Sequence, residues 1–194
     1  INIYCNKYKD ISVDDFFLEI LNASRSVDII VGKSHKWYLT GDTKKHTYKT
    51  VVFDGKNNSQ EYYNIVSKHS SKNEDMINES IWNGESNGSA CSISHYMKFV
   101  GDHKKLNLSI DINQRPSEID NIIDAMHILV KNKKDAWIMV DSKCYWLNEK
   151  NVFPDRAYVG WMIYIPHIIL PELIPEAAKI LPVMNEGNQK GTII

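Results

Sequence analysis

The sequence predicts an α+β protein, with a mainly antiparallel sheet in its C-terminal half and helices flanking that sheet. Three observations predict this class. Apolar side chains recur at helical spacing in 119–130, alternate strictly with polar ones in 106–112, and dominate the uncharged stretch 158–166. Strict alternation is typical of an antiparallel strand that turns one face toward a core. The stretch 158–166 is typical of a strand buried on both faces, with neighbours on each side.

The length and the hydrophobic content of the chain indicate a single domain over residues 1–194. The chain has 194 residues, of which 43% are hydrophobic, so it can bury one sizeable core. We expect a helix-rich part at 1–79 and a sheet-rich part at 80–194. The chain starts with Ile1 and stops within a strand-like Gly191-Thr192-Ile193-Ile194, so we expect a fragment or processed chain whose native C-terminus lies further on.

Charge and cysteine content narrow the class of function. A net charge of −1, without a strongly basic patch, argues against direct nucleic-acid binding. No uninterrupted apolar run reaches the length of about 18 residues that a membrane helix needs. Three scattered cysteines, Cys5, Cys91 and Cys144, do not suggest a disulfide framework, and their odd number suits a reducing cytosol. We expect a cytoplasmic protein, with a monomer favoured.

The first half begins with a helix that Ser12 caps and that carries Asp14 and Asp15 in its first turn. We expect this helix to end near Ser24. The other expectations for this half are a strand or helix end at 27–31, a loop at 33–46 with Trp37 anchored, and a strand at 48–53. Residues 59–80 are expected to be helical in places, with a polar span at 67–75 that either breaks the helix or forms a solvated part of it.

From residue 81 the hydrophobic period changes from 3.6 to 2, which predicts strands at 81–82, 90–99, 106–112, 136–140, 143–147 and 158–166. A helix with Ser117 as N-cap should bury the stripe Ile119, Ile122, Ile123, Met126, Leu129 and Val130. A short helix is expected at 172–180. Gly160 indicates a close backbone approach inside its strand. The tryptophans in strand-like runs should lie in the core: Trp82, Trp137, Trp146 and Trp161.

Gly84-Glu85-Ser86-Asn87-Gly88 matches the Gly-x-Ser-x-Gly pattern of a nucleophile elbow. An elbow needs a buried strand before it and a helix after it, whereas here a short apolar stub precedes it and a strand-like segment follows. A hairpin loop explains the same residues and is favoured. A small serine hydrolase using Ser86 stays as an alternative function.

For the other chemically reactive side chains, a structural role is favoured over metal binding or catalysis. Cys91 and His95 share a strand face and have His103 nearby, but a metal site needs at least three convergent ligands. We expect Cys91 to be a small core residue, and we expect no metal, no cofactor and no pairing of Cys91 with His167 as a nucleophile. His127 is predicted to be a satisfied or boundary residue.

Acidic residues gather in two runs, and such runs are usually solvated faces. The alternative, functional hypothesis is an acidic surface that binds a basic partner and increases the rate of association. The runs comprise Glu74, Asp75, Glu79 and Glu85, and then Asp10, Asp14, Asp15 and Glu19. The candidate partner-binding residues are Glu74, Asp75, Glu79, Glu85, Asp14 and Asp15.

Three segments, taken in order, resemble a known family. They are Ser-Ile-Trp-Asn-Gly at 80–84, Gly-Trp-Met-Ile-Tyr-Ile at 160–165 after the turn 154–156, and Gly-Thr-Ile-Ile at 191–194. This order resembles the immunity protein 52 family of bacterial polymorphic-toxin and type VI secretion systems. The resemblance covers the chain from residue 80 onward, and Gly-Trp-x-x-Tyr is its most specific part. It implies that Trp82, Gly160, Trp161 and Tyr164 determine the fold and form no binding site.

The resemblance implies a non-enzymatic inhibitor that binds a cognate secreted toxin, a nuclease, in a one-to-one complex and so protects the producing cell. The absence of a cofactor loop or catalytic constellation in the sequence is compatible with that function. The alternatives are the Ser86 hydrolase and a phage-related or structural interaction module.

Overall fold

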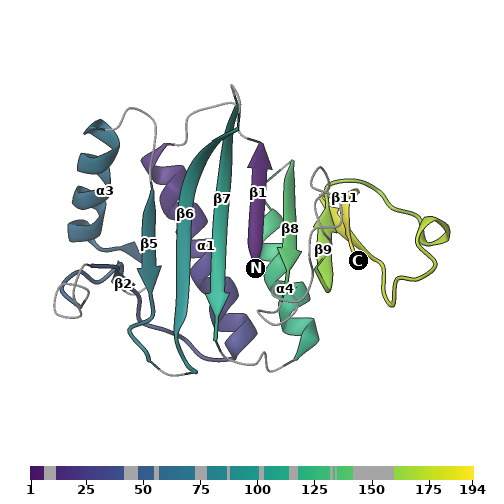
Figure 1. Cartoon of the computed structure of the whole chain (residues 1–194), viewed down its shortest axis with the longest axis horizontal. Coiled ribbons are helices and arrows are strands. Elements are labelled where there is room, and N and C mark those ends of the chain that lie inside the picture. The colour runs from purple at the N-terminus through teal and green to yellow at the C-terminus, as the bar shows by residue number, and fades with distance from the viewer. Residues whose placement is uncertain are drawn as a thin grey trace.

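The computed structural model describes residues 1–6, 12–41, 48–54, 57–72, 78–86, 88–100, 103–113, 118–131, 133, 135–141 and 160–194. Nine strands form one sheet in the order β10-β11-β9-β8-β1-β7-β6-β5-β2, and each neighbouring pair is antiparallel. The helices α1 and α4 cover one face of this sheet, and α3 lies beside the β5 end (Figure 1). The predicted α+β class is confirmed.

The bounds of the elements are as follows. The strands of the large sheet are β1 (Asn2–Asn6), β2 (Tyr38–Leu39), β5 (Glu79–Trp82), β6 (Cys91–Val100), β7 (His103–Ile112), β8 (Ala136–Val140), β9 (Met162–Ile165), β10 (Leu181–Asn185) and β11 (Asn188–Ile193), while β3 (Phe53–Asp54) and β4 (Asn57–Asn58) form a separate pair. The helices are α1 (Val13–Val31), α3 (Gln60–Lys72), α4 (Ile119–Val130) and the 3₁₀ turn η1 (Pro171–Leu173).

The N-terminal strand β1 is a feature that the sequence prediction missed. It lies in the middle of the sheet, where Ile3 faces Leu108 of β7 on one side and Ile138 of β8 on the other. These three side chains are almost fully buried, on the face that α1 and α4 cover. The sheet therefore draws strands from both halves of the chain and is not confined to the second.

Helix α1 starts as predicted, because the Ser12 hydroxyl accepts a hydrogen bond from the Asp15 backbone N–H at 3.0 Å. The predicted end near Ser24 is wrong. Ser24 and Ser26 turn their hydroxyls back to carbonyls of the preceding turn at 2.9 Å, so neither interrupts the helix. The helix runs on until Gly32, whose φ of 71° provides a left-handed C-cap. Residues 27–31 are thus the helix end.

Helix α4 follows the predicted stripe at five of its six positions; Ile119, in the first turn, is 61% exposed. The N-cap is Glu118, with extended backbone angles, and the predicted cap Ser117 lies outside the described residues.

Strand β9 confirms the prediction of a strand buried on both faces. Met162, Ile163 and Tyr164 are all buried, between β8 on one side and β11 on the other. A Cβ at Gly160 would collide with the carbonyl oxygen of Val140, as the predicted close approach requires. Gly191 does the same on the other side, where a Cβ would lie 2.5 Å from the Ile165 oxygen.

Two of the four tryptophan predictions are wrong. Trp137 is 40% exposed and Trp161 is 44% exposed. Trp82 is half-buried, and Trp146 lies outside the described residues. The anchored Trp37 is confirmed, with only 2% of its surface exposed.

The remaining differences lie in short segments. The helix predicted at 172–180 is only η1, because Pro175 holds Ile174 at φ −138° and ψ 69°, outside the helical region. The strand predicted at 48–53 is reduced to a bridge from Val51 to Tyr38 and to β3. The loop at 33–46 contains β2, and α3 runs through 67–72 without interruption. The strand predicted at 143–147 lies outside the described residues. Within the described part of the chain, no helix is long and apolar enough to cross a membrane.

Candidate functional site

The Gly-x-Ser-x-Gly segment forms a loop between the antiparallel neighbours β5 and β6. No helix follows it, so the strand-to-helix turn of a nucleophile elbow is absent here and the predicted loop is confirmed. Ser86 is exposed, and within the described residues its hydroxyl bonds no histidine and no carboxylate. No residue of the described part of the chain is therefore placed to activate Ser86 as a nucleophile.

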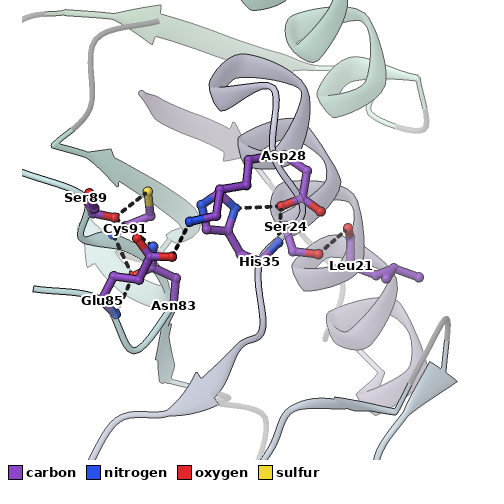
Figure 2. A network of polar contacts seen from close by, with 9 residues as sticks. Leu21, Ser24, Asp28, His35, Asn83, Glu85, Ser89 and Cys91 are labelled. Carbon is purple, nitrogen blue, oxygen red and sulfur yellow. Dashed lines mark hydrogen bonds and ion pairs between the residues drawn. The ribbon is translucent and has the colours of Figure 1, made fainter.

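Asn83 organises this loop, and the sequence analysis missed its role. Its side-chain oxygen accepts from the backbone N–H groups of Glu85 at 3.2 Å and Cys91 at 3.0 Å, and its amide donates to the Ser89 carbonyl at 2.8 Å (Figure 2). The φ of 73° at Gly84 suits a glycine. The signal in the sequence was the Asn-Gly pair at the end of a strand, which is a common turn former.

A second polar pair lies next to this loop. The Asp28 carboxylate on α1 is 2.8 Å from His35 Nδ1 and also accepts from the His35 backbone N–H at 3.1 Å. Burial raises the pKa of Asp28, and the contacts with His35 only partly offset that rise. Figure 2 shows the His35 ring between Asp28 and the β5–β6 loop. Lys33 reaches Glu85 of the loop at 2.6 Å, so this pair links the segment after α1 to the β5–β6 loop, while Asp28 and His35 link α1 to the same segment.

Cys91 sits beside these pairs and is buried. Its side chain is 2% exposed, and burial, together with the carboxylates of Glu85 and Asp28, raises its pKa to about 11. The thiol therefore stays protonated near neutral pH, while reactive cysteines have lowered pKa values. The prediction of a small buried core residue is confirmed.

His95, the predicted neighbour of Cys91, also lies on the helix side of the sheet but pairs with a different residue. Its Nε2 is 3.2 Å from the carboxylate of Glu19 on α1, and Lys133 Nζ lies 2.7 Å from the other Glu19 oxygen. Burial alone raises the pKa of Glu19, but His95 and Lys133 outweigh it and hold that pKa far below its usual range. The three side chains are at most 10% exposed.

Three other histidines were named from the sequence, none of them as an expected ligand. The His103 side chain lies outside the described residues, His127 is half-buried on α4, and the His167 ring packs against Trp137. No group of three or more metal-ligating side chains occurs among the described residues. A recess beside Glu19 and Lys133 has a volume of only about 70 Å³, whereas cofactor and drug-sized ligands need several hundred.

The six predicted partner-binding acids do not form one described cluster. Asp14 and Asp15 are exposed in the first turn of α1. Glu79 pairs with His69 at 2.7 Å, and Glu85 pairs with Lys33. Glu74 and Asp75 lie outside the described residues. Glu19, from the second acidic run, is buried and belongs to no surface.

Three aromatic side chains form a row across the face of the sheet that α1 and α4 leave uncovered. Tyr4 of β1 lies opposite Trp137 of β8 and also opposite Asn107 of β7, which in turn lies opposite Tyr96 of β6. Tyr4 and Tyr96 are each 39% exposed and Trp137 is 40% exposed. Burial and the neighbouring Tyr96 raise the pKa of Tyr4. We call Trp137, Tyr4 and Tyr96 the aromatic row.

More aromatic rings extend this face toward the edge strand β2. Trp82 shares the uncovered face with Ser80, whose hydroxyl donates to that of Ser94 at 3.0 Å. The ring centroid of Tyr48 lies 5.7 Å from that of Trp82 and 5.2 Å from that of Tyr38. Small serine side chains thus separate Trp82, Tyr48 and Tyr38 from the aromatic row.

Comparison with models of known protein families finds no match for the sequence, and no curated protein matches it. No function transfers from a relative on this basis, and the aromatic row is the most informative surface feature of the described residues.

Proposed function

We propose that this chain is a cytoplasmic, monomeric immunity protein, which binds a cognate secreted bacterial toxin one to one and blocks it without catalysis. The observation that supports a binding function is the aromatic row on the uncovered face of the sheet. The class of partner comes from the resemblance of 80–84, 160–165 and 191–194 to the immunity protein 52 family. The resemblance to this family implies that the toxin is a nuclease.

Tyrosine and tryptophan are the side chains that most often dominate the binding energy of protein interfaces. Here three of them are fixed by the hydrogen-bonded register of four adjacent strands, so little backbone entropy is lost when a partner covers them. Each ring leaves more than a third of its surface in water, and this surface is available for burial at about 25 cal/mol per Å² of apolar area.

Charge favours a protein partner over a nucleic acid. Aromatic side chains on open sheets also stack unpaired bases, but such sites combine stacking with a positively charged groove. This chain carries a net charge of −1, and Asp111 of β7 is exposed on the same face as Tyr4, while the register pairs Lys98 with Lys105 two residues along from Tyr96 and Asn107. The net charge of the chain, not the charge of this face, favours a protein partner over a phosphate backbone.

The test uses the toxin domain encoded beside this gene, purified in an inactive form. The variants Tyr4→Ala, Tyr96→Ala and Trp137→Ala are each expected to weaken binding about 10-fold to 30-fold, as truncated hot spots do. Ile119→Ala is the matched control, because Ile119 is 61% exposed but lies on α4, in the helix layer. Thermal unfolding of each variant excludes a folding defect.

Two results would contradict the proposal. The first is an affinity for the toxin that none of the three variants changes. The second is tight binding of the wild-type chain to a single-stranded oligonucleotide that the same variants abolish, which would indicate nucleic-acid recognition.

Ser86→Ala separates this proposal from the hydrolase. We expect the variant to bind the toxin and protect cells as the wild type does, because Ser86 is exposed in a loop away from the aromatic row. Loss of protection with binding intact would instead indicate that Ser86 carries out a reaction.

A further inference from the structure

The segment between β9 and β10, residues 166–180, extends beyond the edge of the sheet (Figure 1, yellow-green). It presents aliphatic side chains to solvent at three neighbouring positions. Ile168 is 59% exposed, Leu170 55% and Leu173 69%. Single exposed apolar residues are ordinary on monomers, whereas a group of this kind in one short segment indicates an interaction site.

The segment is held in place by a buried threonine. The hydroxyl of Thr192 on β11 accepts a hydrogen bond from the Ile169 N–H at 3.0 Å and donates one to the His167 carbonyl at 2.8 Å. Thr192 itself has no exposed surface. The Gly-Thr strand of the sequence analysis thereby acquires a specific role, which is to anchor this segment to the sheet.

Turn hydrogen bonds and prolines hold the rest of the segment. The Leu173 N–H donates to the Leu170 carbonyl at 3.0 Å, and the Ala177 N–H donates to the Ile174 carbonyl at 3.1 Å. Pro166, Pro171 and Pro175 fix three φ angles. The exposed aliphatic side chains therefore have a preformed arrangement, which lowers the entropy lost on binding.

This segment adjoins the aromatic row. The ring of His167 packs edge-on against the ring of Trp137, with centroids 6.2 Å apart. A partner that covers Trp137 can therefore reach the start of the segment without leaving the surface.

The charged side chains of the segment indicate which kind of partner surface would bind it. Glu172 and Glu176 are exposed and form no hydrogen bond or ion pair with another described residue, while Lys179 lies 3.6 Å from Asp120. The aliphatic group thus carries uncompensated negative charge. Such a surface is repelled by anionic membranes and attracted to an apolar groove with a basic rim.

We propose that Ile168, Leu170 and Leu173 insert into an apolar, basic-rimmed groove of the toxin, next to the surface that the aromatic row covers. This inference rests on the proposed function and adds a second contact region to it. The segment determines how long the complex lasts, and its carboxylates increase the rate at which the complex forms.

The test measures association and dissociation rates with the inactive toxin domain. Leu170→Ser combined with Leu173→Ser is expected to weaken affinity about 30-fold, mostly through faster dissociation. Glu172→Gln combined with Glu176→Gln is expected to slow association a few-fold, and added salt should remove that difference. Ile119→Ser is the control for adding a serine at an exposed apolar position of the helix layer.

The outcomes separate the two proposals. If aromatic-row variants weaken binding while the Leu170/Leu173 variant binds like the wild type, the segment has no part in the complex and the inference is wrong, but the proposed function stands. If the wild-type chain does not bind the toxin, both fail. If sedimentation shows a dimer that the Leu170/Leu173 variant dissociates, the occupant is a second copy and the toxin assignment of this segment is overturned.

Discussion

The two faces of the central sheet differ in how continuously they are buried, although the same strands build both. On β1 and β8 the residues Ile3 and Ile138 are at most 1% exposed, while their neighbours Tyr4 and Trp137 are about 40% exposed. Helices α1 and α4 lie on one face of the sheet (Figure 1), and Ile3 and Ile138 belong to the hydrophobic core that includes residues of these helices. The other face is buried at Met139 and Ile163, where β8 meets β9, and exposed at the aromatic row.

The largest effect is expected at Glu19, the buried carboxylate between the helices and the sheet. Glu19→Gln removes the charge that balances Lys133, and breaking a buried ion pair costs about 3–5 kcal/mol of unfolding free energy. Chemical denaturation at pH 7 measures the loss. The matched control is Asp120→Asn, an exposed carboxylate on α4, which should change stability by less than about 0.5 kcal/mol.

The same residue has a pH signature. The pKa of Glu19 is lower in the folded state, so its contribution is fully present above its unfolded pKa of about 4.3 and is lost as the pH falls below that value. Between pH 5 and pH 3 the wild type should therefore lose more stability than Glu19→Gln. The raised pKa of Asp28 makes the opposite contribution to the pH dependence of stability. Because Asp28 is present in both proteins, its contribution cancels when the two are compared. Equal slopes for the two proteins would show that the buried pair is not formed.

Neighbouring residues on β8 give the most direct comparison of the two faces. Ile138→Ala leaves a cavity under the helices and should cost about 2–5 kcal/mol, whereas Trp137→Ala, on the uncovered face, should cost no more than about 1 kcal/mol. Urea unfolding of the two variants measures both. A loss at Trp137 as large as that at Ile138 would mean that the uncovered face belongs to the core.

Thr192 sharpens the comparison, because it lies opposite Ile165 on the face that α1 and α4 leave uncovered and, like Met139 and Ile163 on that face, is buried; its hydroxyl bonds the backbone of residues 167–169. Thr192→Val leaves the Ile169 N–H and the His167 carbonyl without their partner and should cost about 1–3 kcal/mol. Thr192→Ser, which keeps the hydroxyl, should restore most of it. Hydrogen exchange at Ile169 reports the lost bond directly.

The smallest effect is expected from the exposed acids of the helix layer. If the toxin binds the uncovered face, Asp14→Asn combined with Asp15→Asn changes the charge on the far side of the sheet and should slow association by no more than about twofold. Stopped-flow mixing at low salt measures the rate. A tenfold slower association would place the contact on the helix layer and reverse the assignment of the two faces.

Much of the fold followed from local patterns. The strand around Leu108 and the stripe on α4 showed a hydrophobic period, and the stretch that contains β9 showed an uncharged, apolar composition; the structure confirms these elements. Strand β1 was missed because five residues contain too few alternations to stand out, and its pairing partners lie more than a hundred residues away. The end of α1 was misplaced because serines read as helix ends unless their hydroxyls bond to the helix itself.

The candidate site was harder to predict for a different reason. In the structure Trp137 and Tyr4 alternate with buried residues, but the strand that holds Tyr4 was not predicted, and whether a second layer covers a sheet face depends on where distant helices pack. Composition favoured burial of a tryptophan, and the described residues provide only one helical layer. Similarly, the acids Glu79 and Glu85 read as free charges because His69 and Lys33, which pair with them, are distant in sequence.

The central position of β1 has a consequence for biosynthesis. The residues of β1 can pair with their neighbours only after β7 and β8 have been synthesised. The centre of the sheet therefore cannot form until most of the chain has left the ribosome. At cellular translation rates this delay lasts on the order of ten seconds. During that interval β1 lacks its partner strands and exposes apolar side chains, which makes early chaperone contact and slow completion of the fold expected features of this protein in the cell.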